Sequence, residues 1–183
     1  YIIVQIQDEG DFKGKQIVLA EDLLKSLTDN CKIKSYKKIS NFQGKDLEGT
    51  VCCHPFFEIG FKHDIPMLEA LFVTTEQGSG IVHCAPSHGP DDFNLCIKNG
   101  IKAEETVDDD GKYTKNVPLF EGIHIFKANK IIIEKLKEQK KLLANGEVVH
   151  EYPHSWRSKA PLVHRATPQW FISMESHGLR DKA

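Results

Sequence analysis

Short apolar runs, separated by glycine-containing turns and by few helical patterns, constrain the fold of this chain more than any other feature of its sequence. A doubly wound parallel sheet needs a helix between most consecutive strands, and regular helices do not separate these runs. We therefore expect an α+β fold with a β-barrel-like core of short mixed strands and flanking helices. The runs expected to form strands are 1–7, 16–19, 32–39, 68–75, 80–85 and 146–150, and a further apolar run covers 50–57.

Three segments have the spacing of amphipathic helices. Residues 20–30 carry leucines at helical intervals, and residues 127–142 place isoleucines and leucines on one face with lysines toward the C-terminal end. Residues 91–99 follow Pro90 and end before Gly100, which are typical first and last signals of a helix. These three segments are the expected flanking helices.

Composition narrows the class of protein. The 24 Lys and Arg against 26 Asp and Glu give a net charge of −2, which disfavours a protein that holds nucleic acid by net charge alone. No apolar run approaches the ~18 residues of a membrane span. Five cysteines without regular spacing indicate free thiols in a reducing cytoplasm. We separately expect a monomer, which is the simplest oligomeric state.

Domain organisation follows from a change in composition at about residue 150. Beyond it the sequence is dense in proline, aromatic and basic residues. We expect one domain over 1–150 and a connecting segment over 151–183. The chain opens on a strand without an initiator Met, and we expect it to be a piece of a longer protein.

The densest group of chemically active side chains lies in GSGIVHCAPSHGPDDF, residues 78–93, which we name the signature segment. A metal site is disfavoured because His83 and Cys84, adjacent on a strand, would point to opposite faces. A phosphate loop is disfavoured because the glycines precede the apolar run. The segment can also be a plain turn in which Asp91 and Asp92 only stabilise a helix start. In the remaining alternative, Asp92 binds a ligand ammonium group and His83 reaches a hydroxyl or ester oxygen.

The signature segment resembles the Gly-x-Gly-x-Val-His-x-Ala-Pro-x-His-Gly-x-Asp-Asp block of the editing domain of isoleucyl-tRNA synthetases. YPHSWRSKAPLVHRATPQWF, residues 152–171, resembles the segment through which that chain returns from the inserted editing domain to the catalytic Rossmann domain. CHPFF at 53–57 and FEGIHIFKAN at 120–129 also fit this class I synthetase family. The resemblance covers essentially all of the chain.

The resemblance implies hydrolysis of misacylated valyl-tRNA(Ile), with valyl-adenylate as a further candidate substrate. One missing methylene is worth only ~1–3 kcal/mol in a binding pocket, and isoleucyl-tRNA synthetase is itself the standard illustration of this limit. The implied second pocket admits valine, excludes isoleucine and uses a water molecule for attack, with no cofactor and no metal. The implied partners are the 3′ end of tRNA(Ile) and the remaining domains of the synthetase.

The resemblance also assigns roles to residues of the signature segment. Asp92 matches the carboxylate that holds the α-ammonium group, and His83 matches the histidine that helps to exclude isoleucine and positions the ester. These two are the implied catalytic residues. His88 and Asp91 match positions that we expect to be structural, as a loop brace and a helix start. The adjoining wall of the substrate pocket would be formed by Gly80, Ile81 and Val82.

Two departures from the family pattern keep alternatives open. Many relatives have a threonine-rich segment upstream of this chain that contributes to the editing pocket, so a non-catalytic tRNA-positioning module is the competing interpretation. Many relatives also have two cysteines of a zinc site where this chain has Ser155 and Ser158, and we expect no zinc there. A metal-dependent hydrolase is the third alternative. The basic residues of 150–165 suit either contact with tRNA or a simple connector, which we favour.

Overall fold

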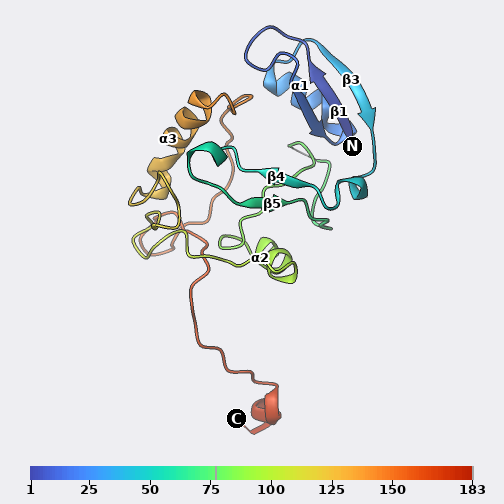
Figure 1. Cartoon of the computed structure of the whole chain (residues 1–183). Helices are drawn as coiled ribbons and strands as arrows, with labels where there is room; N and C mark the ends of the chain where they lie inside the picture. The colour runs from blue at the N-terminus through green and yellow to red at the C-terminus, as the bar shows by residue number, and fades with distance from the viewer. Residues whose placement is uncertain (77, 183) are drawn as a thin grey trace.

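The computed structural model describes residues 1–76 and 78–182, which form two small antiparallel sheets with helices around them (Figure 1). In the first sheet the central strand β1 (Ile2–Ile6) lies between β2 (Gln16–Leu19) and β3 (Tyr36–Asn41). Both neighbours pair antiparallel to β1, and the register against β3 shifts between Ile3 and Val4.

The first sheet carries the apolar core of the N-terminal part. Side chains at alternate positions of β1 are buried because successive residues of a strand face opposite sides. Ile2, Val4 and Leu19 are almost completely buried, and Leu24 and Leu27 pack against them. These two leucines belong to the helix α1 (Leu24–Cys31), which follows the 3₁₀ turn η1 (Glu21–Leu23).

The second sheet is a short hairpin. Strand β4 (Val51–Cys53) pairs with β5 (Asp64–Pro66), and the 3₁₀ turn η3 (Phe57–Ile59) lies between them. Beside this hairpin, Phe56 and Phe120 are buried with ring centroids 5.9 Å apart, within an aromatic cluster. The cluster gives the middle of the chain its own small core.

The remaining helices flank the two sheets. Helix α2 (Pro90–Lys98) follows the signature segment, and α3 (Ile125–Glu138) begins at His124, whose ring accepts a hydrogen bond from the backbone N–H of Phe126. The 3₁₀ turn η2 (Gly44–Leu47) follows β3. Near the C-terminus, η4 (Ser176–Gly178) leads into α4 (Leu179–Lys182).

The elements with a regular pattern are confirmed. Strands form within 1–7 and at 16–19, and the expected strand 32–39 appears two to four residues later as β3. The expected helices 91–99 and 127–142 appear as α2 and α3. Within 20–30 the first turn is 3₁₀ before the α-helix begins.

Three expected strands are wrong. In the part of the chain that the structure describes, 68–75, 80–85 and 146–150 form no strand, and the run 50–57 is a strand only at β4. A strand needs a partner for its backbone groups, and these apolar runs have no ladder beside them. Leu71 and Val149 are 99 % and 100 % exposed, which shows that apolar character alone did not bury them.

The α+β class is confirmed, and the sheets are open. Every strand pair is antiparallel, and within residues 1–76 and 78–182 neither sheet closes into a barrel. The sequence-based expectation of mixed strands and a barrel-like core is therefore wrong for the described residues, which form two open antiparallel sheets.

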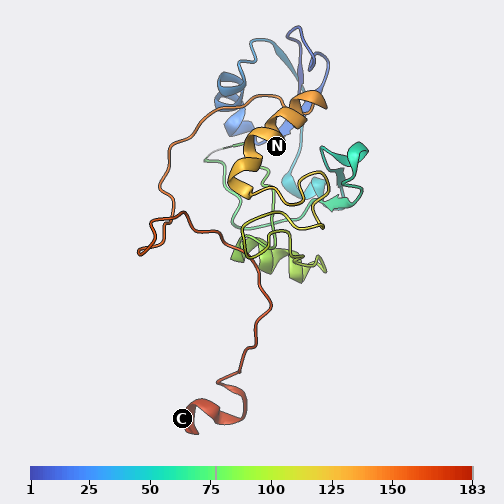
Figure 2. The same cartoon turned by 90° about the vertical axis from the view of Figure 1, so that its left-hand side faces the viewer.

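Much of the surface of the chain is accessible to solvent. The accessible surface is 14115 Å², whereas a compact monomer of this mass exposes about 8,900 Å². The last residues run away from the rest as an extended arm that ends in α4, and both views agree on this (Figures 1 and 2). Trp170 and Phe171 on this arm are 102 % and 85 % exposed. Among the residues described, no helix combines the length and the apolar character that crossing a membrane requires.

Candidate functional site

The first sheet holds the beginning of the signature segment. The backbone N–H of Ala20 donates to the carbonyl of Ser79 at 2.8 Å, and the Tyr1 hydroxyl donates to the carbonyl of Gly80 at 2.7 Å. Gly80 is buried with φ +75°, a conformation that favours glycine. Ile81 after it is half-buried, and Val82 is 51 % exposed. Residues 80–85 form no strand, and these contacts hold only the beginning of the segment.

Asp92 joins the loop of the signature segment to the first turn of α2. Its Oδ2 accepts a hydrogen bond from the backbone N–H of Ala85 at 2.9 Å, and the N–H of His88 donates to the carbonyl of Ala85 at 2.9 Å. The carboxylate is half-exposed and lies where the helix dipole favours negative charge. Asp91 is exposed on the same turn. The loop therefore fixes one carboxylate and leaves its neighbour in solvent.

His83 acts electrostatically on His54, the residue that follows β4. Its imidazole is exposed, and its charge contributes to lowering the pKa of His54, after burial and the charge of His63. In the described part of the chain no hydrogen bond joins His83 to Asp92. The structure thus brings Asp92 together with Ala85 and Cys84, whereas the charge of His83 acts on His54, which the sequence did not single out.

His88 links three segments. Its Nδ1 lies 2.9 Å from the carbonyl oxygen of His164, and its Nε2 lies 2.7 Å from the hydroxyl of Thr106. A carbonyl can only accept, so Nδ1 carries the proton and Nε2 of the neutral ring accepts from Thr106. Buried Ser87 donates to the carbonyl of Glu104, and the N–H of Ala166 donates to the carbonyl of Ser87 at 2.7 Å. The connecting segment is therefore hydrogen-bonded directly to the signature segment.

Arg165 ties the same part of the connecting segment to residues 105–110, which we name the acidic turn. Its guanidinium donates to the carbonyl of Val107 at 3.1 Å, forms an ion pair with Asp109 and lies 3.6 Å from Glu105. Its side chain is 21 % exposed. Sequence reasoning had placed Arg165 only in a general basic tract, because its partners are 56 to 60 residues away along the chain.

Replacing Arg165 by alanine should loosen the connecting segment without unfolding the domain. The expected loss of unfolding free energy is about 1 kcal/mol, mainly from the bond to the Val107 carbonyl, because the exposed acids are screened by water. Limited proteolysis should cut residues 151–163 faster in Arg165→Ala. Exposed Arg157, which contacts the ring of its neighbour Trp156 at 4.9 Å, provides the control variant Arg157→Ala. Equal cleavage of both variants would contradict this role.

The thiols of the site are unreactive in character. Burial raises the pKa of Cys84, and the charge of Asp92 raises it further; the same two causes raise the pKa of buried Cys96. A thiol with a raised pKa holds little of the nucleophilic thiolate at neutral pH. Cys84 therefore does not suit the role of a nucleophile.

Alkylation by iodoacetamide at pH 7.5 should reach exposed Cys53 well before Cys84 and Cys96. We expect the rate at Cys84 to be at least about tenfold lower, because Cys84 is less exposed than Cys53 and its own raised pKa limits the thiolate it can form. Peptide mass spectrometry over time measures each site separately. Modification of Cys84 at the rate of Cys53 would show that the thiol is activated.

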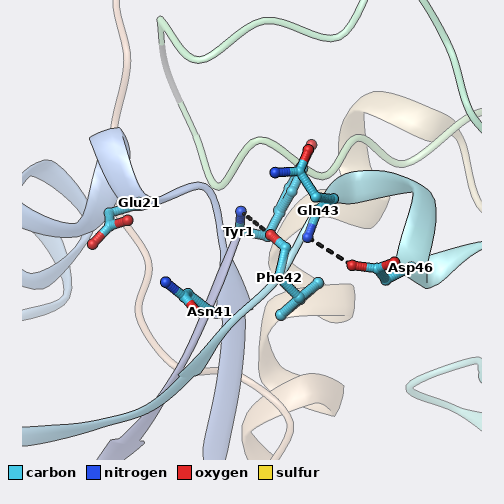
Figure 3. A pocket seen from close by; sticks show the side chains of 6 residues that line it. All are labelled: Tyr1, Glu21, Asn41, Phe42, Gln43 and Asp46. Carbon is cyan, nitrogen blue, oxygen red and sulfur yellow. Dashed lines mark hydrogen bonds between the residues drawn. The ribbon is translucent and has the colours of Figure 1, made fainter.

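Two surface pockets lie elsewhere. One, of about 310 Å³, is formed where β3 meets η2, and Figure 3 shows its side chains, with the N–H of Gln43 donating to Asp46 at 2.8 Å. The second, of about 360 Å³, lies between the acidic turn and Arg165. Neither is lined by His83 or Asp92. The residues of the first pocket are Tyr1, Glu21, Asn41, Phe42, Gln43 and Asp46.

Two further points concern metal ligands. Within the described residues, no three His, Cys, Asp or Glu side chains gather as a metal ion would require. Ser155 and Ser158 lie in a turn, where the N–H of Ser158 donates to the Ser155 hydroxyl at 3.3 Å. The Ser158 hydroxyl accepts in turn from the N–H of Ala160 at 3.3 Å, so both hydroxyls have a local structural use.

Comparison with known proteins gives a consistent result. No family model matches the chain. It is 76 % identical over 183 residues to the isoleucine–tRNA ligase of Pelagibacter ubique, covering all of this chain and 20 % of that protein. Over the whole chain it is 43 % identical to the isoleucine–tRNA ligase of Hahella chejuensis and 41 % identical to that of Gluconobacter oxydans, covering 19 % and 21 % of them. The chain spans about one fifth of the length of the curated relatives it matches.

Proposed function

From the homology of the whole chain to a segment of about one fifth of isoleucine–tRNA ligases, we propose that it is the editing domain of such an enzyme. Residues 1–150 form the domain, and 151–183 lead back to the catalytic part. The protein acts in the cytoplasm as part of a monomeric synthetase, with tRNA(Ile) as its partner. The similarity to isoleucine–tRNA ligases supports the identity of the enzyme, and the resemblance of the signature segment to the editing-domain block supports the editing role.

The proposed reaction removes valine from valyl-tRNA(Ile). Water adds to the ester carbonyl carbon, the bond to the ribose oxygen breaks, and valine and tRNA with a free terminal hydroxyl are released. Asp92 holds the α-ammonium group of valine, and His83 positions the ester and limits the space for a larger side chain. Gly80, Ile81 and Val82 line the approach, and His88 and Asp91 support the loop and the helix start. Valyl-adenylate is a second candidate substrate.

The observation that carries this proposal is the placement of Asp92. The Ala85 N–H fixes one oxygen of a half-exposed carboxylate at the start of α2. A fixed carboxylate at a loop surface suits an ammonium ligand, because the geometry is set before binding and little order is lost.

A tRNA-positioning module without catalysis is the second candidate. Neither surface pocket is lined by His83 or Asp92, and no hydrogen bond joins the two side chains in the described part of the chain. The same residues would then hold the aminoacylated end of tRNA without hydrolysing it.

Calorimetry with non-hydrolysable aminoacyl-adenosine analogues tests the editing role. We expect the valyl analogue to bind, the isoleucyl analogue to bind at least about tenfold more weakly, and Asp92→Ala to lose the valyl analogue. Equal affinity for both analogues would remove the size selection. Binding with selection, but no release of valine from valyl-tRNA(Ile), would support the positioning module.

A further inference from the structure

One turn of the signature segment determines where the Asp92 carboxylate lies. The N–H of His88 donates to the carbonyl of Ala85 and closes the turn, and the N–H of Ala85 donates to Asp92 Oδ2, both at 2.9 Å. Gly89 comes directly before α2, and a Cβ there would lie 3.4 Å from the same oxygen. A shift of this turn would therefore move the carboxylate or break its hydrogen bond.

Two segments distant in the sequence hold this turn from outside, residues 104–106 and residues 164–166. We name these two segments the clamp. The clamp makes four hydrogen bonds to two consecutive residues of the turn, Ser87 and His88. Ser87 is buried and His88 is half-buried. Polar groups in such places are costly to leave unpaired, so the clamp restrains the turn.

Thr106 supplies the one clamp side chain among these four bonds. Its hydroxyl lies 2.7 Å from His88 Nε2 and donates to it, because Nδ1 of the neutral ring donates to the carbonyl of His164 at 2.9 Å. The Ser87 hydroxyl donates to the backbone carbonyl of Glu104. A substitution at Thr106 can therefore remove one bond to the turn and leave the backbone bonds in place.

The two segments of the clamp are joined to each other as well as to the turn. The guanidinium of Arg165 donates to the carbonyl of Val107 at 3.1 Å and lies 3.6 Å from the carboxylate of Glu105. Next to it, the N–H of Ala166 donates to the carbonyl of Ser87 at 2.7 Å. The clamp and the turn thus form one hydrogen-bonded unit.

We propose that Thr106, with the backbone of 164–166, positions Asp92 for the ammonium group of the aminoacyl ester. Thr106 acts through His88 and the turn, and it does not touch the substrate. A carboxylate that is fixed before binding loses little order when it binds, so a loosened turn lowers affinity although the charge is kept. The inference rests on the proposed editing function, and it extends the site into residues 104–106 and into the connecting segment.

Hydrogen exchange of the Ala85 amide, followed by nuclear magnetic resonance on the full chain, tests the clamp without any ligand. Thr106→Val removes the hydroxyl and keeps the shape of the side chain. We expect exchange at Ala85 to become about fivefold faster, the factor that corresponds to one lost hydrogen bond. Thr106→Ser restores a hydroxyl and should return the rate to within about twofold. An unchanged rate in Thr106→Val would overturn the proposal.

Calorimetry with the non-hydrolysable valyl analogue tests the positioning role. We expect affinity to fall about fivefold in Thr106→Val and to recover in Thr106→Ser. Thr114→Val is the matched control, because the Thr114 hydroxyl donates to the carbonyl of Glu105 at 2.8 Å and, in the described part of the chain, forms no hydrogen bond to the turn. This control should lose as much stability in urea as Thr106→Val and leave both the affinity and the exchange at Ala85 unchanged.

The outcomes separate this inference from the editing function. Equal falls in affinity for Thr106→Val and Thr114→Val would show a general effect of stability and overturn the positioning role. Selective binding of the valyl analogue that is identical in Thr106→Val and the unmodified chain would leave the editing function standing and remove this inference alone. No binding of the valyl analogue by the unmodified chain would remove the editing function and the positioning role together, even where exchange at Ala85 responds to Thr106.

Discussion

Asp92→Ala should abolish most hydrolysis of valyl-tRNA(Ile). Truncating one partner of a desolvated charge pair costs about 2–5 kcal/mol, which corresponds to about a 30-fold to several-thousand-fold fall in kcat/KM. The variant loses both the charge proposed to face the valine ammonium group and the acceptor for the Ala85 N–H at 2.9 Å. Release of labelled valine from preformed valyl-tRNA(Ile) measures the effect.

Two matched variants separate charge from loop geometry. Asp92→Asn keeps an oxygen that can accept from Ala85 but removes the charge, so it should be nearly as inactive as Asp92→Ala while remaining as stable as the unmodified chain. Asp91→Ala removes a neighbouring carboxylate that is exposed on the same turn, and it should retain activity within about twofold. Full activity in Asp92→Asn would show that Asp92 only closes the loop. That result would favour the alternative in which the signature segment is a plain turn.

Local patterns predicted the elements that depend on local contacts. Alternation along β1 buries Ile2, Val4 and Ile6, and the sequence alone indicated this strand. Pro90 and the two acids after it indicated the start of α2 within one residue. In both places the same few residues determine the backbone conformation and the buried face.

Tertiary contacts decided what the patterns could not. The run 80–85 has strand composition, yet its beginning is held by Ala20 and Tyr1, which lie 59 and 79 residues away from their partners. The partners of His88 are likewise separated from it by 18 and 76 residues. A motif showed that His83 and Asp92 belong to one segment, but it gave no indication that the charge of His83 would help to lower the pKa of His54.

Gly80→Ala should destabilise the chain more than any other single glycine substitution in the signature segment. A left-handed backbone costs a residue with a Cβ about 1–2 kcal/mol, and crowding a packed site costs about 1–3 kcal/mol more. Gly80 has φ +75°, and a Cβ there would lie 2.6 Å from the Cβ of Ala20 and 3.5 Å from its backbone nitrogen. The expected loss is therefore about 2–5 kcal/mol, measured by urea unfolding followed by circular dichroism.

Gly78 offers a control in the same turn, because it has φ +75° and a Cβ there would meet nothing within 4 Å. Gly78→Ala should cost only the backbone part, about 1–2 kcal/mol. Adding Ala20→Gly to Gly80→Ala removes the clashing methyl group, so the double variant should recover part of the lost stability, and the coupling between the two changes measures the contact. Equal losses for Gly78→Ala and Gly80→Ala, without coupling to Ala20, would show that the signature segment is not packed against the first sheet. In that case the sheet would not hold the pocket wall in place, and the valyl selectivity proposed for it would need another support.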